Sequence, residues 1–380
     1  MRKLKNIKWN QCIIYLALFA VTGYFGFFGI QKDLNRLTTL LLEKAAIAMI
    51  LAISLNLVVG FLGELSLGHA GFMCVGAYLG AKLAVVLTGV MGPGNELLIL
   101  FICLIAGGTA AAVCGMIIGL PALRLRGDYL AIVTLAFGEI VRSVFENLPD
   151  ELFGGSLGQK TVRFDRYTLF IIAFALVIVT LAIIQNFIRS KHGRAVTAIR
   201  DSEIAARATG INVTKYKLTV FTIAAFFAGI AGVLFAFTQS KVQPTTFDYN
   251  YSIEILVMVV LGGMGSLHGS LISAVLITYM NEKLQIVLTG DLAVLRGLLY
   301  ALVMILLVIY RNAPGLKAFR EKWSIKQLLA KIRRHDPAKI HDDEANWDRV
   351  PTKIMVDEVL SVDIQTKSPY KPDAKWKEEE

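Results

Sequence analysis

A few polar side chains lie inside otherwise apolar stretches of the sequence. Glu139 and Arg142 are three residues apart, a spacing that puts both on one face of a helix. Ser66 and His69 lie in a glycine-broken segment, and Glu254 follows later. Polar groups at membrane depth are costly and often line a passage for a polar solute. These five residues are therefore candidates for a translocation pathway, although a helix-end charge, an intrahelical pair or a histidine bonded to a neighbouring helix explains each one more simply.

The sequence shows no catalytic or metal-binding pattern. It contains no G-x-x-x-x-G-K-[ST] phosphate loop, and no zinc motif or Ser/His/Asp arrangement stands out among the five histidines. We expect no catalytic residue, no metal and no cofactor in this chain, so that any ATP used must bind another polypeptide. The four cysteines all lie in apolar stretches and are expected to pack as small hydrophobic side chains: Cys12, Cys74, Cys103 and Cys114.

The composition indicates a membrane protein. Hydrophobic residues make up 55% of the chain, charged residues only 18%, and the mean hydropathy is +0.60. The apolar runs are close to the roughly 20 residues that cross a ~30 Å bilayer core as a helix. We predict an all-α, polytopic transmembrane bundle of ten helices, the eighth being short and either broken or re-entrant at its glycines. The predicted ranges are 12–30, 38–62, 66–88, 97–119, 128–147, 168–188, 216–239, 251–263, 268–289 and 294–311.

Lys and Arg are concentrated at the N-terminus and in alternate connections. Ten helices place the four basic stretches on one side, which the positive-inside rule makes cytoplasmic. We therefore predict that both termini are cytoplasmic and that the first apolar run is a retained helix. The net charge of +10 reflects this orientation rather than binding to nucleic acid. The basic stretches are 1–8, 123–127, 189–217 and 311–322.

Small residues recur at four-residue spacing in two predicted helices. A face of small side chains lets helix backbones approach closely in lipid, where apolar burial alone provides no driving force. We expect close packing at Gly76, Gly80, Gly107, Ala111, Gly115 and Gly119.

The connection 189–217 has the pattern of a short, rigid helix. Asp201 and Ser202 can cap its N-terminus, and Gly210 can end it in the left-handed conformation. A helix of this kind could dock against another protein, because small exposed residues permit close approach. From the pattern alone, a plain surface helix between two spans is an equally good interpretation. The residues that we expect it to expose are Glu203, Ile204, Ala205 and Ala206.

The C-terminal part has a different composition. We divide the chain into a transmembrane domain (1–317), a basic amphipathic helix suited to anionic membrane lipids (318–335) and a polar, flexible cytoplasmic tail (336–380). An ordinary solvated helix is the alternative for the middle segment.

Several segments resemble the permease family of ABC importers for branched-chain amino acids. Residues 203–210 read E-I-A-A-x-x-x-G, which resembles the glutamate-alanine-alanine…glycine loop that docks into the ATPase, with one residue inserted after Glu203. At Gly154–Gly158 the chain lacks an Asn that the family commonly has. Urea-importer permeases are close relatives, so urea, amides and other amino acids remain alternative substrates. The remaining similar segments are Asn56–Phe72, Leu123–Arg142, Gly193–Leu218 and Val259–Gly269.

The resemblance implies partners and a location. It implies a second homologous permease subunit, two ATP-binding subunits that hold ATP and Mg²⁺, and an extracytoplasmic substrate-binding protein, in a bacterial cytoplasmic membrane. ATPase closure would then drive alternating access through the 201–210 helix. An ion-coupled secondary transporter is one alternative, but the sequence has few acids inside the apolar stretches that could bind the ion. A membrane-embedded enzyme is a second alternative, which the lack of a catalytic cluster disfavours.

Overall fold

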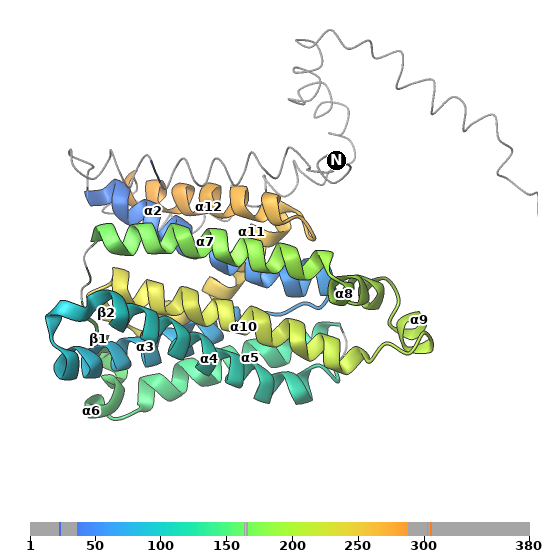
Figure 1. The fold of residues 1–380 in the computed structure, drawn as a ribbon, viewed down its shortest axis with the longest axis horizontal. Coiled ribbons are helices and arrows are strands. Elements are labelled where there is room, and N and C mark those ends of the chain that lie inside the picture. Colours follow the sequence, from blue (N-terminus) through green and yellow to red (C-terminus); the bar gives the residue numbers. More distant parts are fainter. Residues whose placement is uncertain are drawn as a thin grey trace, which may run out of the picture. The chain divides into compact units, whose positions relative to one another are not determined.

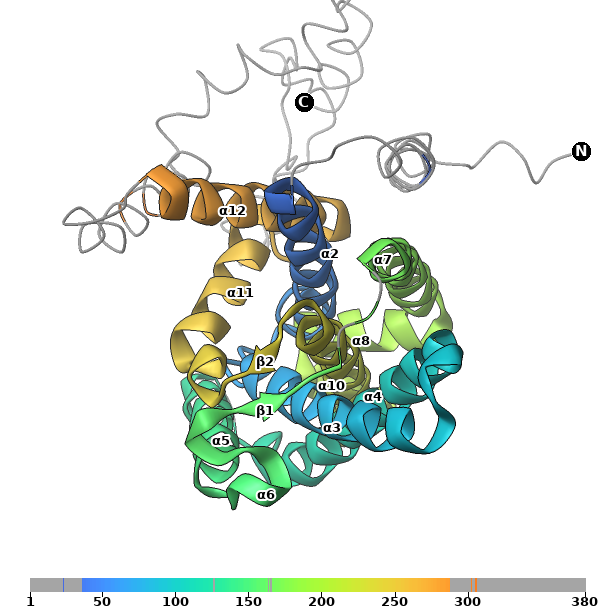
Figure 2. The same ribbon diagram turned by 90° about the vertical axis from the view of Figure 1, so that its left-hand side faces the viewer.

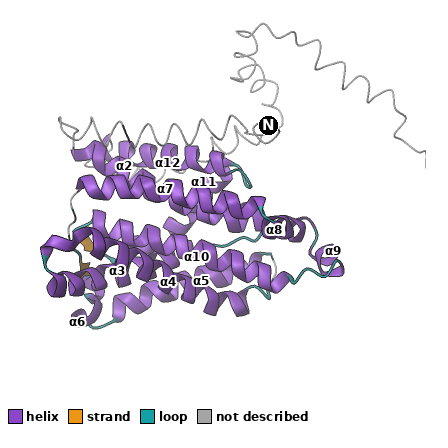
Figure 3. Cartoon of the chain, viewed as in Figure 1, coloured by secondary structure: helices purple, strands orange, loops and turns teal. Residues whose placement is uncertain are grey.

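The computed structural model describes residues 36–287, except 126, 163 and 165, together with the single residues 23, 302 and 305. This part of the chain is almost entirely helical (Figure 3). Apart from those single residues, the predicted helices 12–30 and 294–311 lie outside the described residues, as do segments 318–335 and 336–380.

The described elements follow one another along the chain with short connections. In order they are α2 (Arg36–Asn56), the π-helical turn η1 (Leu57–Leu62), α3 (His69–Met91), η2 (Pro93–Asn95), α4 (Glu96–Ala122), α5 (Asp128–Asn147), α6 (Asp150–Phe153), η3 (Gly155–Leu157), β1 (Gln159–Lys160), α7 (Arg166–Arg189), α8 (Lys191–Asp201), α9 (Glu203–Ala208), α10 (Val213–Thr238), β2 (Lys241–Val242), η4 (Pro244–Phe247), α11 (Tyr249–Gly262) and α12 (Leu267–Val287).

The all-α prediction is confirmed for the described residues. A helix occupies each of the eight ranges predicted between residues 38 and 289, with ends that differ by a few residues at most. Two strands of two residues each do not alter this class. Within the described part of the chain, five helical segments are long and apolar enough to cross a membrane: Thr38–Leu62, His69–Met91, Glu96–Ala122, Thr168–Arg189 and Val213–Thr238.

The long helices run side by side along the bundle (Figures 1 and 2). We call the end that carries α8 and α9 the loop end, and the opposite end, which carries β1 and β2, the strand end. The strands pair antiparallel, with Gln159 opposite Val242. Because β1 precedes α7 and β2 follows α10, this pairing joins two connections that are far apart in sequence.

The first described span is interrupted before α3. Helix α2 continues as the π-helical turn η1, which stops at Gly63, whose φ of +82° is left-handed. Residues 63–68 are not helical, and α3 begins at His69. A Cβ at Gly63 would lie 2.7 Å from the Arg200 side chain, so both the backbone conformation and the close approach favour glycine here.

Helix α11 ends where the sequence predicts. Its 14 residues stop at Gly262, a length of about 21 Å at 1.5 Å per residue, which is shorter than the ~30 Å core of a bilayer. Gly263 has a φ of +95° and turns the chain toward α12. The prediction that this helix is short and ends at paired glycines is therefore confirmed.

The six predicted packing residues lie where α3, α4 and α10 pack against one another. A Cβ at Gly76 would collide with the backbone of Gly229 in α10, and one at Gly80 would lie 2.7 Å from Val233. The four small residues of α4 face α10, and the first of them also faces α3. Gly107 lies beside Gly76 and Val233. The other three pairs are Ala111 with Gly229, Gly115 with Ala225, and Gly119 with Leu218.

The close approach at Gly76 leads to a test. We expect Gly76→Ala to lower the free energy of unfolding by about 1–3 kcal/mol, because the added methyl group meets backbone that cannot rotate away. Gly89→Ala is the matched control in the same helix, where a Cβ meets no described atom within 4 Å. Thermal unfolding in detergent measures both variants. Equal melting temperatures for the two would contradict the packing role.

Candidate functional site

The loop end contains two short helices in succession. The Ser202 hydroxyl accepts a hydrogen bond from the backbone N–H of Ala205 at 3.3 Å and so caps α9. Gly210 follows with a φ of +83°. Asp201, expected to share the capping role, is instead the last residue of α8, and its carboxylate accepts hydrogen bonds from the Arg200 guanidinium. Sequence analysis did not predict α8 as a separate helix; the cap that marks its start is Ser190.

The outer face of α9 is narrower than predicted. Ile204 is 78% exposed, and Ala205 is exposed beside it. Ala206 was expected to be exposed but is only 3% exposed. It lies on the side of this short helix that packs on the bundle, and its carbonyl accepts a hydrogen bond from the N–H of Ile211. Of the four residues expected to be exposed, Ile204 and Ala205 are exposed and Glu203 is only partly so, while Arg207 and Ala208 of α9 are exposed as well.

A buried lysine connects α9 to the interrupted span. The Lys217 ammonium, in the second turn of α10, forms an ion pair with Glu64 and another with Glu203, whose Oε2 is 3.3 Å away. The exposed fractions of the three side chains are 4%, 13% and 21% for Lys217, Glu64 and Glu203. Glu203 also accepts a hydrogen bond from Arg207 at 2.5 Å. We call Lys217, Glu64 and Glu203 the lysine cluster.

Arg200 makes a second connection from the loop end. Its Nη1 donates to the carbonyl of Gly60, in η1, at 3.1 Å. Carbonyls in the last turn of a helix lack intrahelical partners and carry partial negative charge, so a guanidinium is a suitable donor there. On the other side of the same turn, Asn56 accepts from the N–H of Gly265 at 2.9 Å and donates to the Ser270 hydroxyl at 2.8 Å. Residues 56–64 thus contact α8, α10 and the α11–α12 connection.

Ser66 lies in the non-helical segment, His69 is the first residue of α3, and both are buried. His69 Nε2 is 2.8 Å from the Ser54 hydroxyl on α2, so the histidine is bonded to a neighbouring helix, as the simpler interpretation requires. Within the described residues, the Ser66 hydroxyl has no hydrogen-bond partner. The backbone here is held by Thr134 of α5, which accepts from the N–H of Leu67 at 3.0 Å.

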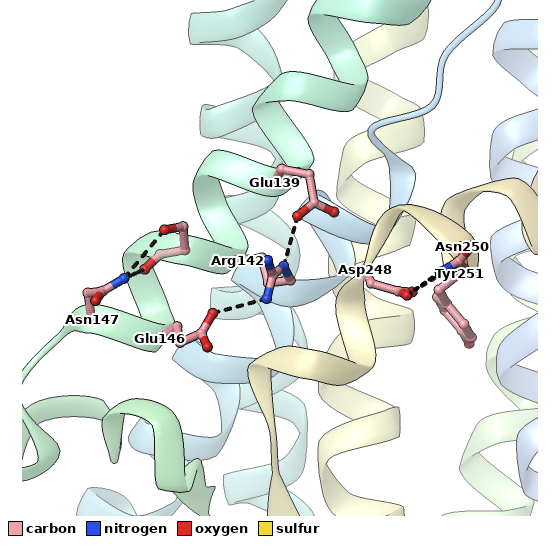
Figure 4. Close-up of polar contacts among 8 residues, drawn as sticks. Glu139, Arg142, Glu146, Asn147, Asp248, Asn250 and Tyr251 are labelled. Carbon is pink, nitrogen blue, oxygen red and sulfur yellow. Dashed lines mark hydrogen bonds and ion pairs between the residues drawn. The ribbon is translucent and has the colours of Figure 1, made fainter.

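The predicted pair on α5 forms (Figure 4). Arg142 Nε donates to Glu139 at 2.9 Å, and its Nη1 donates to Glu146 at 3.0 Å. All three side chains are between one quarter and about one third exposed. On α11, Asp248 caps the helix by accepting from the N–H of Tyr251 at 3.0 Å. The arginine is thus matched by acids on its own helix.

Glu254, the last pathway candidate, lies on α11 and accepts a hydrogen bond from Asn281 of α12 at 3.2 Å. It lines a cavity of about 340 Å³ near the strand end. The five candidates therefore do not form one site. Glu139 and Arg142 lie on α5, Ser66 lies in the non-helical segment before α3, His69 contacts α2, and Glu254 contacts α12. Among the described residues, no group of three or more His, Cys, Asp or Glu side chains could hold a metal ion.

Four of the residues that make these connections were not singled out by sequence analysis. Arg200 and Lys217 were counted only as charges that set orientation, although Lys217 lies just inside an apolar run, which is an unusual place for a lysine. Asn56 and Glu64 lie in a segment that resembles the permease family, yet neither was assigned a role. A search for single polar residues at helix ends would have found them.

A bundle of long apolar helices, with a short capped helix tied to an interrupted span, is the architecture of a multi-pass membrane transport subunit. The chain belongs to the family described as branched-chain amino acid transport system / permease component, whose profile matches residues 37–308.

The chain is also similar to individual relatives. It is 37% identical over 317 residues to the high-affinity branched-chain amino acid transport system permease protein LivM of Salmonella typhimurium, and equally to that of Escherichia coli; each match covers 75% of this chain and 71% of the relative. The ribose import permease protein RbsC of Escherichia coli is 32% identical over 126 residues, covering 32% of this chain and 38% of the relative. No solved structure matches.

The lysine cluster can be tested by removing its cation. We expect Lys217→Met to cost about 3 kcal/mol of unfolding free energy, because the Glu64 carboxylate would stay largely out of water without its cation and Glu203 would keep only the exposed Arg207. The double variant Lys217→Met/Glu64→Gln should recover part of that loss, because it also removes one of the unpaired charges. Lys215→Met, an exposed lysine on the same helix, is the control. Thermal unfolding of the wild type, Lys217→Met, Glu64→Gln and the double variant measures the coupling between Lys217 and Glu64. Additive effects of the two single changes would rule this coupling out.

Proposed function

We propose that this chain is a permease subunit of an ABC importer that moves branched-chain amino acids into the cell, driven by separate ATPase subunits. The family and the two relatives that match most of the chain carry the substrate assignment. The ribose permease matches a much shorter stretch, so it supports the transport class rather than a sugar substrate.

The transport mechanism that we propose starts at α9. Ile204 and Ala205 provide the face that docks into a cleft of the ATPase, while Ala206 anchors the helix on the bundle. Glu203 carries movement inward, since its carboxylate is paired with Lys217. Separating buried charges is expensive, so α9 and α10 move together when the ATPase pulls on α9.

From Lys217 the movement passes to the interrupted span. Glu64 lies in the non-helical segment that follows η1, and this segment is hydrogen-bonded to Thr134 of α5 at Leu67. The N–H of Ala70 donates to Ser252 of α11 at 3.1 Å. A displacement of Glu64 would therefore change the positions of α3, α5 and α11 relative to α2. We propose that this rearrangement opens the pathway alternately to the two sides.

The orientation follows from charge. The loop end carries the basic connection 189–217, so we place it in the cytoplasm and the strand end outside. With ten spans, both termini are cytoplasmic, and the chain lies in a bacterial cytoplasmic membrane. We retain segment 318–335 as an interfacial helix on anionic lipids and 336–380 as a cytoplasmic tail.

The assembly that we propose contains other chains. A second homologous permease subunit completes the pathway, two ATP-binding subunits supply ATP and Mg²⁺ sites, and an extracytoplasmic binding protein delivers the amino acid. Gly76, Gly80 and their counterparts in α4 keep α3, α4 and α10 together as one unit during the movement.

The docking face can be tested without disturbing the lysine cluster. We expect Ile204→Asp to reduce the amount of ATPase that co-purifies in detergent at least tenfold, because an acid would replace an apolar contact at the centre of a small interface. Leu157→Asp is the matched control. It too replaces an exposed aliphatic side chain in a short helix with an acid, but Leu157 lies at the strand end, so this variant should retain the ATPase. Equal retention by the two variants would exclude α9 as the docking helix.

The energy source and substrate can be tested in proteoliposomes that contain the complete importer. We expect leucine uptake that requires ATP on the cytoplasmic face and persists when ion gradients are collapsed. This chain reconstituted alone should not concentrate leucine. Uptake that survives ATP depletion but stops with an ionophore would instead establish ion-coupled transport, and a complex that imports only ribose or urea would refute the substrate assignment.

A further inference from the structure

The cavity beside Glu254 lies apart from the loop-end connections. It has a volume of about 340 Å³ and lies between α2, α11 and α12, where the chain leaves α10 and passes through β2 and η4. This volume falls within the range of small-molecule sites, about 300–1,000 Å³. With the loop end in the cytoplasm, the cavity lies in the outer half of the bundle. A solute released by an external binding protein would reach this half first.

The charges that line the cavity are balanced. Two lysines, Lys44 of α2 and Lys241 of β2, line it together with two glutamates, Glu254 of α11 and Glu282 of α12. Lys44 and Glu282 form an ion pair at 2.5 Å, and Asn281 donates to Glu254. Charges of both signs thus come from four separate elements and face one space.

The cavity also has an apolar wall. Ile47 and Ala48 of α2, Phe235 of α10 and Met258 of α11 line it, and all four side chains are less than 10% exposed. They are aliphatic, aromatic and thioether groups, which bind branched hydrocarbon without requiring a hydrogen bond.

The two lysines, the two glutamates and the apolar wall of the cavity together favour one class of ligand, because the charges of the ligand must balance those of the side chains. A ligand with one ammonium and one carboxylate can pair with Glu and Lys at once and leave no net charge in a site that is partly shielded from solvent, where the Lys44 and Glu282 side chains are 34% and 21% exposed. A ligand with only one charge would leave one side-chain charge uncompensated, which is costly away from water. A sugar offers no ion pair and no branched hydrocarbon for the apolar wall.

We propose that this cavity is a binding site for a zwitterionic α-amino acid with an aliphatic side chain, occupied after the solute leaves the binding protein. The α-ammonium pairs with Glu254 and Glu282, the α-carboxylate pairs with Lys44 and Lys241, and the side chain lies against Ile47, Phe235 and Met258. The assignment rests on the proposed import of branched-chain amino acids, and it adds a site within the permease itself.

The test is protection of a cysteine placed in the cavity. Thr278, which is 8% exposed and lines the cavity, is changed to Cys in the complete importer without binding protein, in a non-ionic detergent. Alkylation at this position is followed by mass spectrometry. We expect saturating leucine or valine to slow it by the factor 1 + [L]/Kd, about tenfold at a ligand concentration ten times Kd. Ser156→Cys, on η3 outside the cavity, is the control and should react at the same rate with or without leucine.

Fragments of leucine test the charge argument. We expect 4-methylpentanoate and 3-methylbutylamine, which each keep the hydrocarbon and one charged group, to protect Thr278→Cys far less than leucine, and ribose not at all. Glu254→Gln should weaken protection by leucine. Lys82→Met should leave it unchanged, because Lys82 of α3 is a partly exposed lysine that does not line the cavity. If Thr278→Cys does not assemble, Thr246→Cys reports on the same cavity.

The outcomes separate this inference from the proposed function. If the complex imports leucine but leucine, its fragments and ribose protect equally or not at all, the site is refuted and the function stands. If a zwitterionic lipid protects and leucine does not, the cavity is a lipid site and the inference is wrong. If the complex imports no amino acid, the proposed function fails in the uptake assay before the labelling is considered.

Discussion

The connection between the loop end and the bundle depends on an ammonium group held almost completely out of water. The Lys217 side chain is 4% exposed and has two acids beside it. Glu64 lies 153 residues from Lys217 in the sequence, and Glu203 lies 14 residues from it. Breaking the contact between Lys217 and Glu64 would leave the Glu64 carboxylate without its cation in a poorly solvated place, whereas Glu203 also has Arg207. Lys217 thus ties α9, α10 and the segment after η1 to one another, even though α9 itself has only six residues.

Two regions of the bundle differ in how their backbones are held. Helices α3, α4 and α10 pack closely against one another, whereas the helical structure is interrupted between α2 and α3. Glycines at the α3–α4–α10 contacts bring backbones so close that even a methyl group does not fit at Gly76. In contrast, the α2–α3 connection contains a π-helical turn, a left-handed glycine and a stretch without helix, held by side-chain hydrogen bonds from Arg200, Asn56 and Thr134. Such bonds can be exchanged more easily than close backbone packing, so we expect a rearrangement to cost less here than at the glycine contacts of α3, α4 and α10.

Much of the architecture is predictable from the sequence because apolar runs define helices in a membrane protein. The range 128–147 is predicted to the residue, and the glycines at 262 and 263 correctly end α11. The site is harder to predict because it depends on partners distant in sequence. Glu64 lies 153 residues from Lys217, and the burial of Ala206 follows from how α9 packs against the bundle. The helix α8 was missed because its polar sequence has no apolar run.

Glu203 pairs with two cations that differ in their exposure to solvent, Arg207 and Lys217. Dissolved salt therefore affects the two ion pairs differently. The Arg207 side chain is 56% exposed, so mobile ions screen its attraction to Glu203, whereas they hardly reach Lys217. With the loop end in the cytoplasm, as we propose, a rise in internal salt concentration weakens the contact between Glu203 and Arg207 while the contact between Glu203 and Lys217 persists. The tie between α9 and the bundle is accordingly tolerant of osmotic stress, and it is the surface half of the helix that loosens first.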